Sequence, residues 1–144
     1  MAVDSQVSDT TRETVTQLRQ GLLRLHKILL ELERAAYERG RGRISNSYEF
    51  LQIVLKDPWF DWLHRLSELI VQIDETLDTA NSDTPATEED ALALITRAKL
   101  LLAPSESGSE FQKNYFLALQ QSPDVVLLHS EIMRILGKKG SLIS

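Results

Sequence analysis

Apolar residues recur every three or four positions through the first third of the chain. This alternation continues over about three heptads, which is typical of one narrow apolar face on a long helix. Thr10 and Glu13 fit a capping box at its start, and Gly40 and Gly42 fit its end. The pattern predicts a helix from about 10 to 39, with an apolar face formed by Val15, Leu18, Leu22, Leu25, Leu29, Leu32 and Ala36.

Polar borders divide the rest of the chain into further helical stretches. All four prolines fall at such borders, where a fixed φ and a missing N–H are tolerated. The residues expected to accept hydrogen bonds from the first free N–H groups are Asn46 or Ser47, Asp57, Thr87, Ser109 and Ser122. We therefore expect helices over residues 47–56, 57–80, 87–103, 109–121 and 122–137, the last one ending at Gly137.

The predicted fold class is all-α, because no segment combines strand alternation with turn residues. Four main helices packed antiparallel through short loops, with one short extra helix, form the expected bundle. A chain of 144 residues fits a single domain. We place that domain at residues 10–137, between a flexible N-terminal tail at 1–9 and a C-terminal tail at 138–144.

Composition points to a soluble, cytoplasmic protein. The sequence is 42% hydrophobic and 26% charged, and it has no cysteine, which excludes disulfides and thiolate chemistry. The polar start differs from a signal peptide, and no apolar run approaches the roughly 20 residues that span a bilayer. The net charge is −5, so we do not expect nucleic-acid binding. Residues 12–43 are locally basic, with eight Lys and Arg against four Asp and Glu.

The segment KDPWFDWLHRLSE (56–68) holds both tryptophans beside several side chains able to do chemistry. On a helical wheel both tryptophans fall in an apolar arc of about 120°, which favours a core-facing role. Asp61, His64 and Glu68 lie on the opposite side, as a solvated ion-pair face. A metal site would need ligands on several helices, and the chain has three histidines. We predict no metal, no cofactor and no catalytic residue.

Polar residues also border the apolar faces. Asp74 and Ser67 lie at the margin of the stripe on the helix at 57–80, and a hydrogen bond to a neighbouring helix is the favoured interpretation. The alternative is that Asp74 is the acid of a ligand pocket. His26 and Glu33 flank the apolar face of the first helix, where a packed, hydrogen-bonded histidine is favoured over a catalytic one. The same applies to His129.

A basic stripe on the first helix contains two leucines away from the main apolar face. It spans about 80° of the helix and includes the candidate interaction residues Arg19, Leu23, Lys27, Leu30 and Arg34. A solvated face is the simplest interpretation of such a stripe. The embedded leucines favour the alternative, in which a partner or a second protomer covers it.

The sequence ERGRGR (38–43) alternates arginine with glycine just past the first helix. Arginine binds phosphate or carboxylate in a bidentate way, and glycine lets the backbone approach an anion. The simpler interpretation is a soluble helix stop. If a ligand binds, we expect it at Arg39, Arg41 and Arg43, with Asp74 or Glu33.

The segment DPWFDWLHRLSELIVQIDE (57–75) resembles a phrase in small uncharacterised bacterial proteins. Its shared form is roughly Pro-x-Phe-x-Trp-Leu-x-x-Leu-Ser-x-Leu-Ile-Val-x-Ile-Asp-Glu, and this chain departs from it at Trp59 and His64. The resemblance covers nineteen of the 144 residues. It implies a bacterial origin and a helical domain, and it transfers no activity or site residue.

These features favour a non-enzymatic helical bundle that acts through protein–protein contacts, as a homo-oligomer or an adaptor. The alternative is a helical protein that binds an anion or small molecule at the arginine loop, possibly as an enzyme. In the first hypothesis an exposed apolar surface binds a protein partner, and in the second the arginines bind the ligand.

Overall fold

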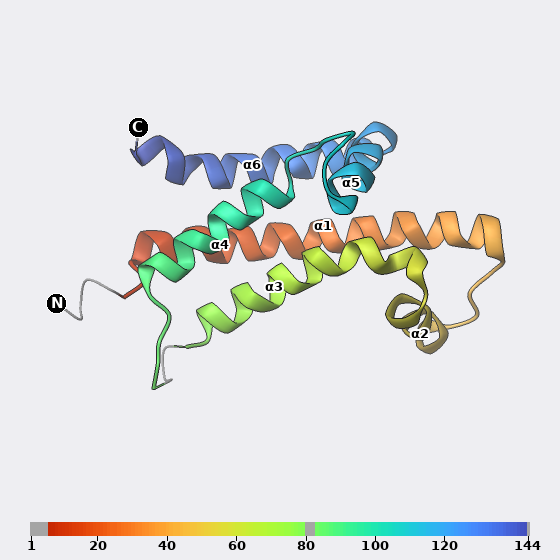
Figure 1. Cartoon of the computed structure of the whole chain (residues 1–144), viewed down its shortest axis with the longest axis horizontal. Helices are drawn as coiled ribbons and strands as arrows, with labels where there is room; N and C mark the ends of the chain where they lie inside the picture. Colours follow the sequence, from red (N-terminus) through yellow and green to blue (C-terminus); the bar gives the residue numbers. More distant parts are fainter. Residues whose placement is uncertain (1–5, 80–82, 144) are drawn as a thin grey trace.

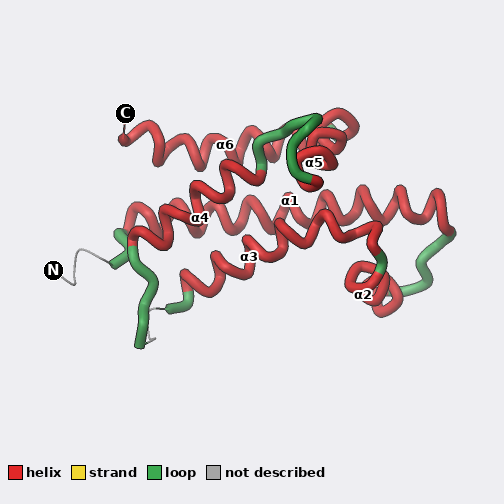
Figure 2. Tube along the Cα trace, viewed as in Figure 1, coloured by secondary structure: helices red, strands yellow, loops and turns green. Residues whose placement is uncertain are grey.

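The structure is a computed structural model that describes residues 6–79 and 83–143. Within these residues the fold is an all-α helical bundle, as predicted (Figures 1 and 2). The helices are α1 (Asp9–Arg41), α2 (Ser47–Lys56), the 3-10 helix η2 (Pro58–Leu63), α3 (His64–Leu77), α4 (Glu88–Leu101), α5 (Glu110–Gln121) and α6 (Pro123–Ile143). Extended pairing in the described ranges is limited to an isolated bridge between Gln6 and Thr87.

The long helix α1 lies at the centre of the bundle, and α3, α4 and α6 all pack against it. α1 and α4 run in one direction and α3 and α6 in the other, so α1 is antiparallel to both α3 and α6 (Figure 1). These are the four main helices that the sequence predicted. Two short helices accompany them, α2 and α5, where one was expected.

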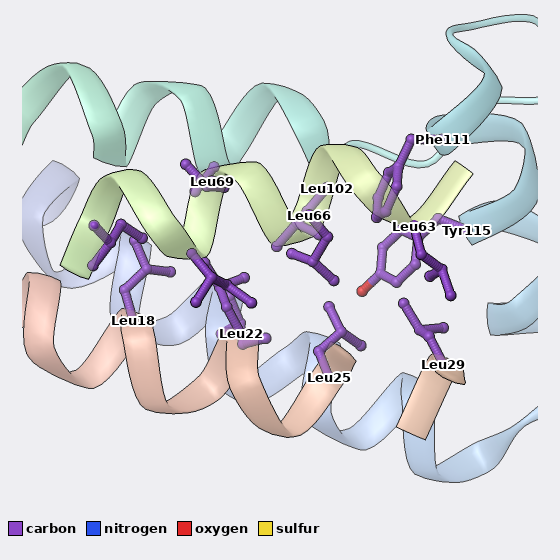
Figure 3. Close-up of a cluster of buried hydrophobic side chains, with 14 of the residues drawn as sticks. Leu18, Leu22, Leu25, Leu29, Leu63, Leu66, Leu69, Leu102, Phe111 and Tyr115 are labelled. Carbon is purple, nitrogen blue, oxygen red and sulfur yellow. The ribbon is translucent and has the colours of Figure 1, made fainter. Parts of the chain in front are cut away.

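The apolar face of α1 forms one side of the core. Its leucines face those of η2 and α3 in Figure 3, together with Leu102 just after α4, and the rings of Phe111 and Tyr115 from α5 close one end. The ring centroids of Trp62 and Phe111 lie 5.4 Å apart, and those of Phe111 and Tyr115 lie 5.6 Å apart. The buried residues of this α1 face are Val15, Leu18, Leu22, Leu25 and Leu29. The chain itself therefore covers the predicted seam from Val15 to Leu29, whereas Leu32 and Ala36 are only partly buried.

α1 and α6 approach closely at Gly21, which is buried in the middle of α1. A Cβ atom at this position would lie 2.9 Å from Cγ1 of Ile132 on α6. Contacts this short are essentially absent between real Cβ atoms and their neighbours. The missing side chain therefore allows Ile132 to sit directly on the α1 backbone.

Most helix starts follow the predicted capping chemistry. Asn46 accepts a hydrogen bond from the N–H of Glu49 at 2.8 Å, and Asp57 accepts one from the N–H of Trp59 at 2.9 Å. Thr87 and Ser109 each form a complete capping box. These caps satisfy N–H groups that would otherwise lack partners.

The start of α1 differs from the prediction. Ser8, not Thr10, caps the helix, and its side chain accepts from the N–H of Thr11 at 3.1 Å. The carboxylate of Glu88 on α4 accepts from the Ser8 N–H at 2.8 Å and from the Thr11 hydroxyl at 2.6 Å. The predicted Thr10–Glu13 box is wrong because a distant carboxylate organises this turn. Residues 6–9, predicted as part of a flexible tail, are held against the start of α4.

Two other boundaries also differ. Residues 58–63 form a 3-10 helix, so a wheel drawn at 100° per residue misplaces them: Phe60, absent from the predicted stripe, is fully buried. The predicted end at Gly137 is wrong, because α6 continues to Ile143. Glycine costs about 1 kcal/mol relative to alanine inside a helix, which neighbouring turns can offset. The side chains of the predicted tail at 138–144 lie outside the described part of the chain.

Candidate interaction surface

Polar side chains of α1 contact α3 at intervals of seven residues. Arg12 donates to the carbonyl oxygen of Leu77 at 3.2 Å, Arg19 forms an ion pair with Asp74, and His26 shares a hydrogen bond of 2.9 Å with Ser67. The predicted bonds of Asp74 and Ser67 to a neighbouring helix are confirmed. Arg19, one residue of the basic stripe on α1, therefore helps to hold α3 in place while its side chain stays partly exposed to solvent.

Glu33 continues this row towards η2. It is half-buried, and burial raises the pKa of its carboxyl, while the indole N–H groups of Trp59 and Trp62 act in the opposite direction. The Trp59 indole nitrogen is buried and forms no hydrogen bond of good geometry with the described residues. For His26, burial lowers the pKa, and the nearby charge of His64 lowers it further. Both groups are packed between helices.

The predicted end of the first helix near residue 39 is wrong, because α1 continues to Arg41: Arg39 and Arg41 lie in its last turn, and only Arg43 lies in the loop that follows. This arginine region is only partly free to bind a ligand. The guanidinium of Arg41 lies 3.4 Å from the carboxylate of Asp57 and about equally far from the rings of Tyr37 and Trp59, at 5.7 and 5.6 Å from their centroids. Arg39 and Arg43 are exposed to solvent. Glu33 and Arg41 both approach Trp59, so these two predicted residues lie in the same region of the molecule.

Asp74 does not belong to that region. Its partner Arg19 lies roughly 30 Å from Arg41 along α1, at a rise of 1.5 Å per residue. The predicted ligand-binding set is therefore divided between the two ends of the α1–α3 contact. An anion at the arginine loop would meet Arg39 and Arg43 without Asp74.

The predicted interaction residues on α1 are also divided. Leu30 packs against the core, and Arg34 lies 4.6 Å above the centroid of the Phe50 ring. Lys27 is exposed, and Leu23 is 40% exposed. Leu23 is thus a single apolar residue on a polar face, which is ordinary for a protein surface.

Among the side chains that the structure describes, the largest run of exposed apolar residues on one helix is on α2. Tyr48, Leu51 and Leu55 are exposed by 73%, 52% and 59%. They recur at intervals of three and four residues, so they share one face of the helix. No residue of α2 is buried, although a helix that is apolar on several sides is normally enclosed. We call Tyr48, Leu51 and Leu55 the outer face of α2.

The opposite side of α2 holds the helix on the bundle. Phe50, Ile53 and Val54 pack against the core, and the ring centroids of Phe50 and Phe60 lie 5.8 Å apart. The two apolar sides are about 140° apart at 100° per residue. Because only one of them contacts η2, the other remains uncovered. The segment SYEFLQIVLK contains this signal, because its apolar residues lie on more than one side of the helix.

Other described residues with ionisable or nucleophilic side chains form contacts within the fold. Tyr115 and His129 share a hydrogen bond of 2.7 Å, and burial raises the pKa of Tyr115 and lowers that of His129. His64 lies 4.0 Å from Asp61 on the exposed side of the chain, as expected for a solvated pair. Within the described residues, no three His, Asp or Glu side chains are grouped to hold a metal ion.

A groove of about 470 Å³ runs between α3 and α4. Its walls include Thr76, Thr79, Thr84, Glu75 and Asp90, and a hydrogen bond between Arg97 and Gln72 lies at its edge. Its described lining combines hydroxyl groups with acids.

No family model, no curated protein and no solved structure matches this chain. The resemblance of residues 57–75 to small bacterial proteins stays a prediction. Of the described helices, none has the length and apolarity needed to cross a bilayer.

Proposed function

We propose that this protein acts through protein–protein contacts and that the outer face of α2 is its binding surface. The observation that supports this is the exposure of Tyr48, Leu51 and Leu55 on a helix without a buried residue. Burying the exposed halves of these side chains contributes on the order of 2–5 kcal/mol. Grouped apolar exposure of this kind marks interaction sites on soluble proteins.

The position of α2 favours binding without rearrangement of the bundle. α2 packs mainly against η2, at the end of the molecule where α1 ends, and both the start of α1 and the end of α6 lie at the opposite end (Figure 1). The Asn46 cap and the contacts of Phe50 hold the helix in place. A partner would therefore meet a preformed helix, which lowers the entropic cost of association.

Site-specific photo-crosslinking tests this proposal in the cells that naturally produce the protein. A photoreactive residue at Leu51 or Leu55 is expected to capture one discrete partner, whereas the same residue at Leu100, 66% exposed on α4, is not. The purified partner should then bind the wild type and lose binding to the Leu51→Ser, Leu55→Ser variant in calorimetry. Equal capture from Leu100, or unchanged binding of the double variant, would contradict the proposal.

Light scattering distinguishes an adaptor from a homo-oligomer. A multiple of 16.3 kDa that becomes 16.3 kDa in the Leu51→Glu, Leu55→Glu variant would identify a second copy as the partner. The corresponding Leu23→Glu variant is the control on α1. The alternative function, anion binding at the arginine loop, is less supported because Arg41 is already paired with Asp57.

A further inference from the structure

Ser67 on α3 contacts a histidine and also lines a hollow of the surface. Its Oγ atom lies 2.9 Å from Nε2 of His26 on α1, a distance at which a histidine can act as the base for a serine nucleophile. The same hydroxyl lies 3.4 Å from the carbonyl oxygen of Leu63, so His26 is the closer acceptor for its one hydrogen. The hollow has a volume of about 470 Å³ and runs along the exposed side of α3. Because His26 does not line it, a molecule bound there would meet the serine first.

His26 is in the state that a base requires. Burial lowers the pKa of its imidazole below the ordinary value of 6.5, and the nearby charge of His64 lowers it further. The ring is therefore neutral at pH 7 and has one nitrogen free to accept a proton. The ion pair of Arg19 with Asp74, two turns away on the same helices, helps to hold α1 against α3. The serine and its base are thus positioned before any ligand binds.

The lining of the hollow restricts what can bind there. His64 lies one turn before Ser67 and lines the same hollow, where its ring can donate a hydrogen bond to a ligand oxygen. Val71 is 54% exposed and offers apolar contact to a short acyl or alkyl group. Glu68 and Glu75 contribute carboxylates, and no Lys or Arg is among the described lining residues. This charge disfavours phosphates and other anions, and it favours neutral or cationic molecules.

We propose that Ser67 and His26 form an acyl-transfer site that hydrolyses small neutral or cationic carboxylic esters. This activity is separate from protein binding at α2 and does not depend on it. Ser67 Oγ attacks the ester carbonyl carbon while Nε2 of His26 takes the hydroxyl proton, and His64 donates to the oxygen that becomes negative. The bond to the alcohol oxygen then breaks, and this oxygen leaves with the proton held by His26. Water next attacks the acyl-serine with His26 again as base, which releases the carboxylic acid and restores Ser67.

Labelling with an uncharged alkyl fluorophosphonate tests the nucleophile on the purified full chain. The probe forms a bond from an activated serine Oγ to phosphorus and loses fluoride, and peptide mass spectrometry locates the adduct. We expect an adduct at Ser67 in the folded wild type. It should be absent from the Ser67→Ala variant and from wild type unfolded in urea, where His26 no longer contacts the serine. A folded wild type without an adduct at Ser67 would overturn the proposal, whether or not any variant folds.

Two histidine variants distinguish a base from a packing contact. His26→Gln should slow the labelling of Ser67 by roughly 10²- to 10⁴-fold, the usual contribution of a general base. His129→Gln is the matched control, because His129 is also half-buried and shares a hydrogen bond of 2.7 Å with a hydroxyl, that of Tyr115. This control should be labelled at the wild-type rate, and circular dichroism verifies that both variants are folded. Equal labelling rates in the two variants would overturn the proposal.

The pH dependence of labelling provides a second test of the base. Since the base acts in its neutral form and the pKa of His26 is lowered, the wild-type rate should stay constant from pH 8 to below 6.5 and then fall. The charged groups along this contact are His64, Arg19 and Asp74, and the last two are paired with each other. A rate that instead rises steadily with pH, as for hydroxide-driven reaction of an ordinary serine, would overturn the proposal.

Hydrolysis of three acetate esters tests the substrate class. Acetylcholine is cationic, phenyl acetate is neutral and acetylsalicylate is anionic, and we expect the first two to be hydrolysed faster than the third. The Glu68→Gln, Glu75→Gln variant should reduce the preference for acetylcholine over acetylsalicylate by about 2- to 30-fold, at the usual strength of exposed charge pairs. Preference for the anionic ester would overturn the assigned substrate class. Hydrolysis at the same rate in Ser67→Ala would overturn the site itself.

Discussion

Replacing Gly21 by alanine tests the closest contact between α1 and α6. In an exposed helix this change gains about 1 kcal/mol, because alanine has the higher helix propensity. At Gly21 the new methyl group would lie 2.9 Å from Cγ1 of Ile132 and 3.5 Å from its Cδ1. Forcing a methyl group into a packed core costs typically 1–3 kcal/mol. We expect Gly21→Ala to destabilise the protein by about 0–2 kcal/mol.

Gly40 provides the matched control in the same helix. A Cβ atom there meets nothing within 4 Å, so Gly40→Ala should stabilise the protein by up to about 1 kcal/mol. The difference between the two variants cancels most of the propensity term and leaves the overpacking cost of about 1–3 kcal/mol. Urea unfolding followed by far-UV circular dichroism measures both free energies of unfolding.

A double-mutant cycle with Ile132 identifies the contact itself. Ile132→Ala alone should cost about 2–5 kcal/mol, because it leaves a cavity in the core. Combined with Gly21→Ala, the loss should be smaller than the sum of the two single losses, since the methyl group then occupies free space. Equal stabilisation by Gly21→Ala and Gly40→Ala, or strict additivity in the cycle, would refute the packing of α6 on Gly21.

Three further predictions concern caps and ionisable groups. Ser8→Ala should cost about 1 kcal/mol in urea unfolding, whereas Thr10→Ala should cost little, because Ser8 caps α1; equal losses would contradict this. Glu33→Gln should stabilise the protein at pH 7, and the gain should shrink as pH falls towards 4.5, since the pKa of Glu33 is raised in the folded state; a pH-independent gain would contradict burial as its cause. Burial lowers the pKa of His26 and His129 in the folded protein. Below about pH 6.5 the unfolded chain therefore binds more protons than the folded protein, and the free energy of unfolding falls. Replacing both histidines by Gln should flatten that decline, and an unchanged slope would exclude them.

Local chemistry made much of the bundle predictable. The seam from Val15 to Leu29 depends only on spacing along one helix, and the caps at Asn46, Thr87 and Ser109 depend on residues within three positions. The start of α1 was mispredicted because Glu88 lies on another helix. No local pattern at Thr10 contains that information.

The candidate surface was harder to predict, because exposure depends on how helices dock. Leu30 and Leu51 are both leucines on amphipathic segments, yet one packs against the core and the other faces solvent. The contact of Phe50 with Phe60 determines which side of α2 is covered. Phe60 in turn lies in the 3-10 helix η2, which sets its direction. The sequence of α2 is apolar on several sides, and only the tertiary contacts show which side is free.

Because α6 packs on α1, the core cannot close until the end of α6 has been synthesised. Until then the leucines of α1 lack the side chains that complete their burial, which are Val125, Leu128, Ile132 and Leu136. Until α6 has emerged from the ribosome, the apolar face of α1 that α6 covers is therefore exposed. Contacts between such distant segments also slow folding. During this interval α1 is a natural target for chaperones that bind exposed leucine-rich helices, and the finished fold removes that target.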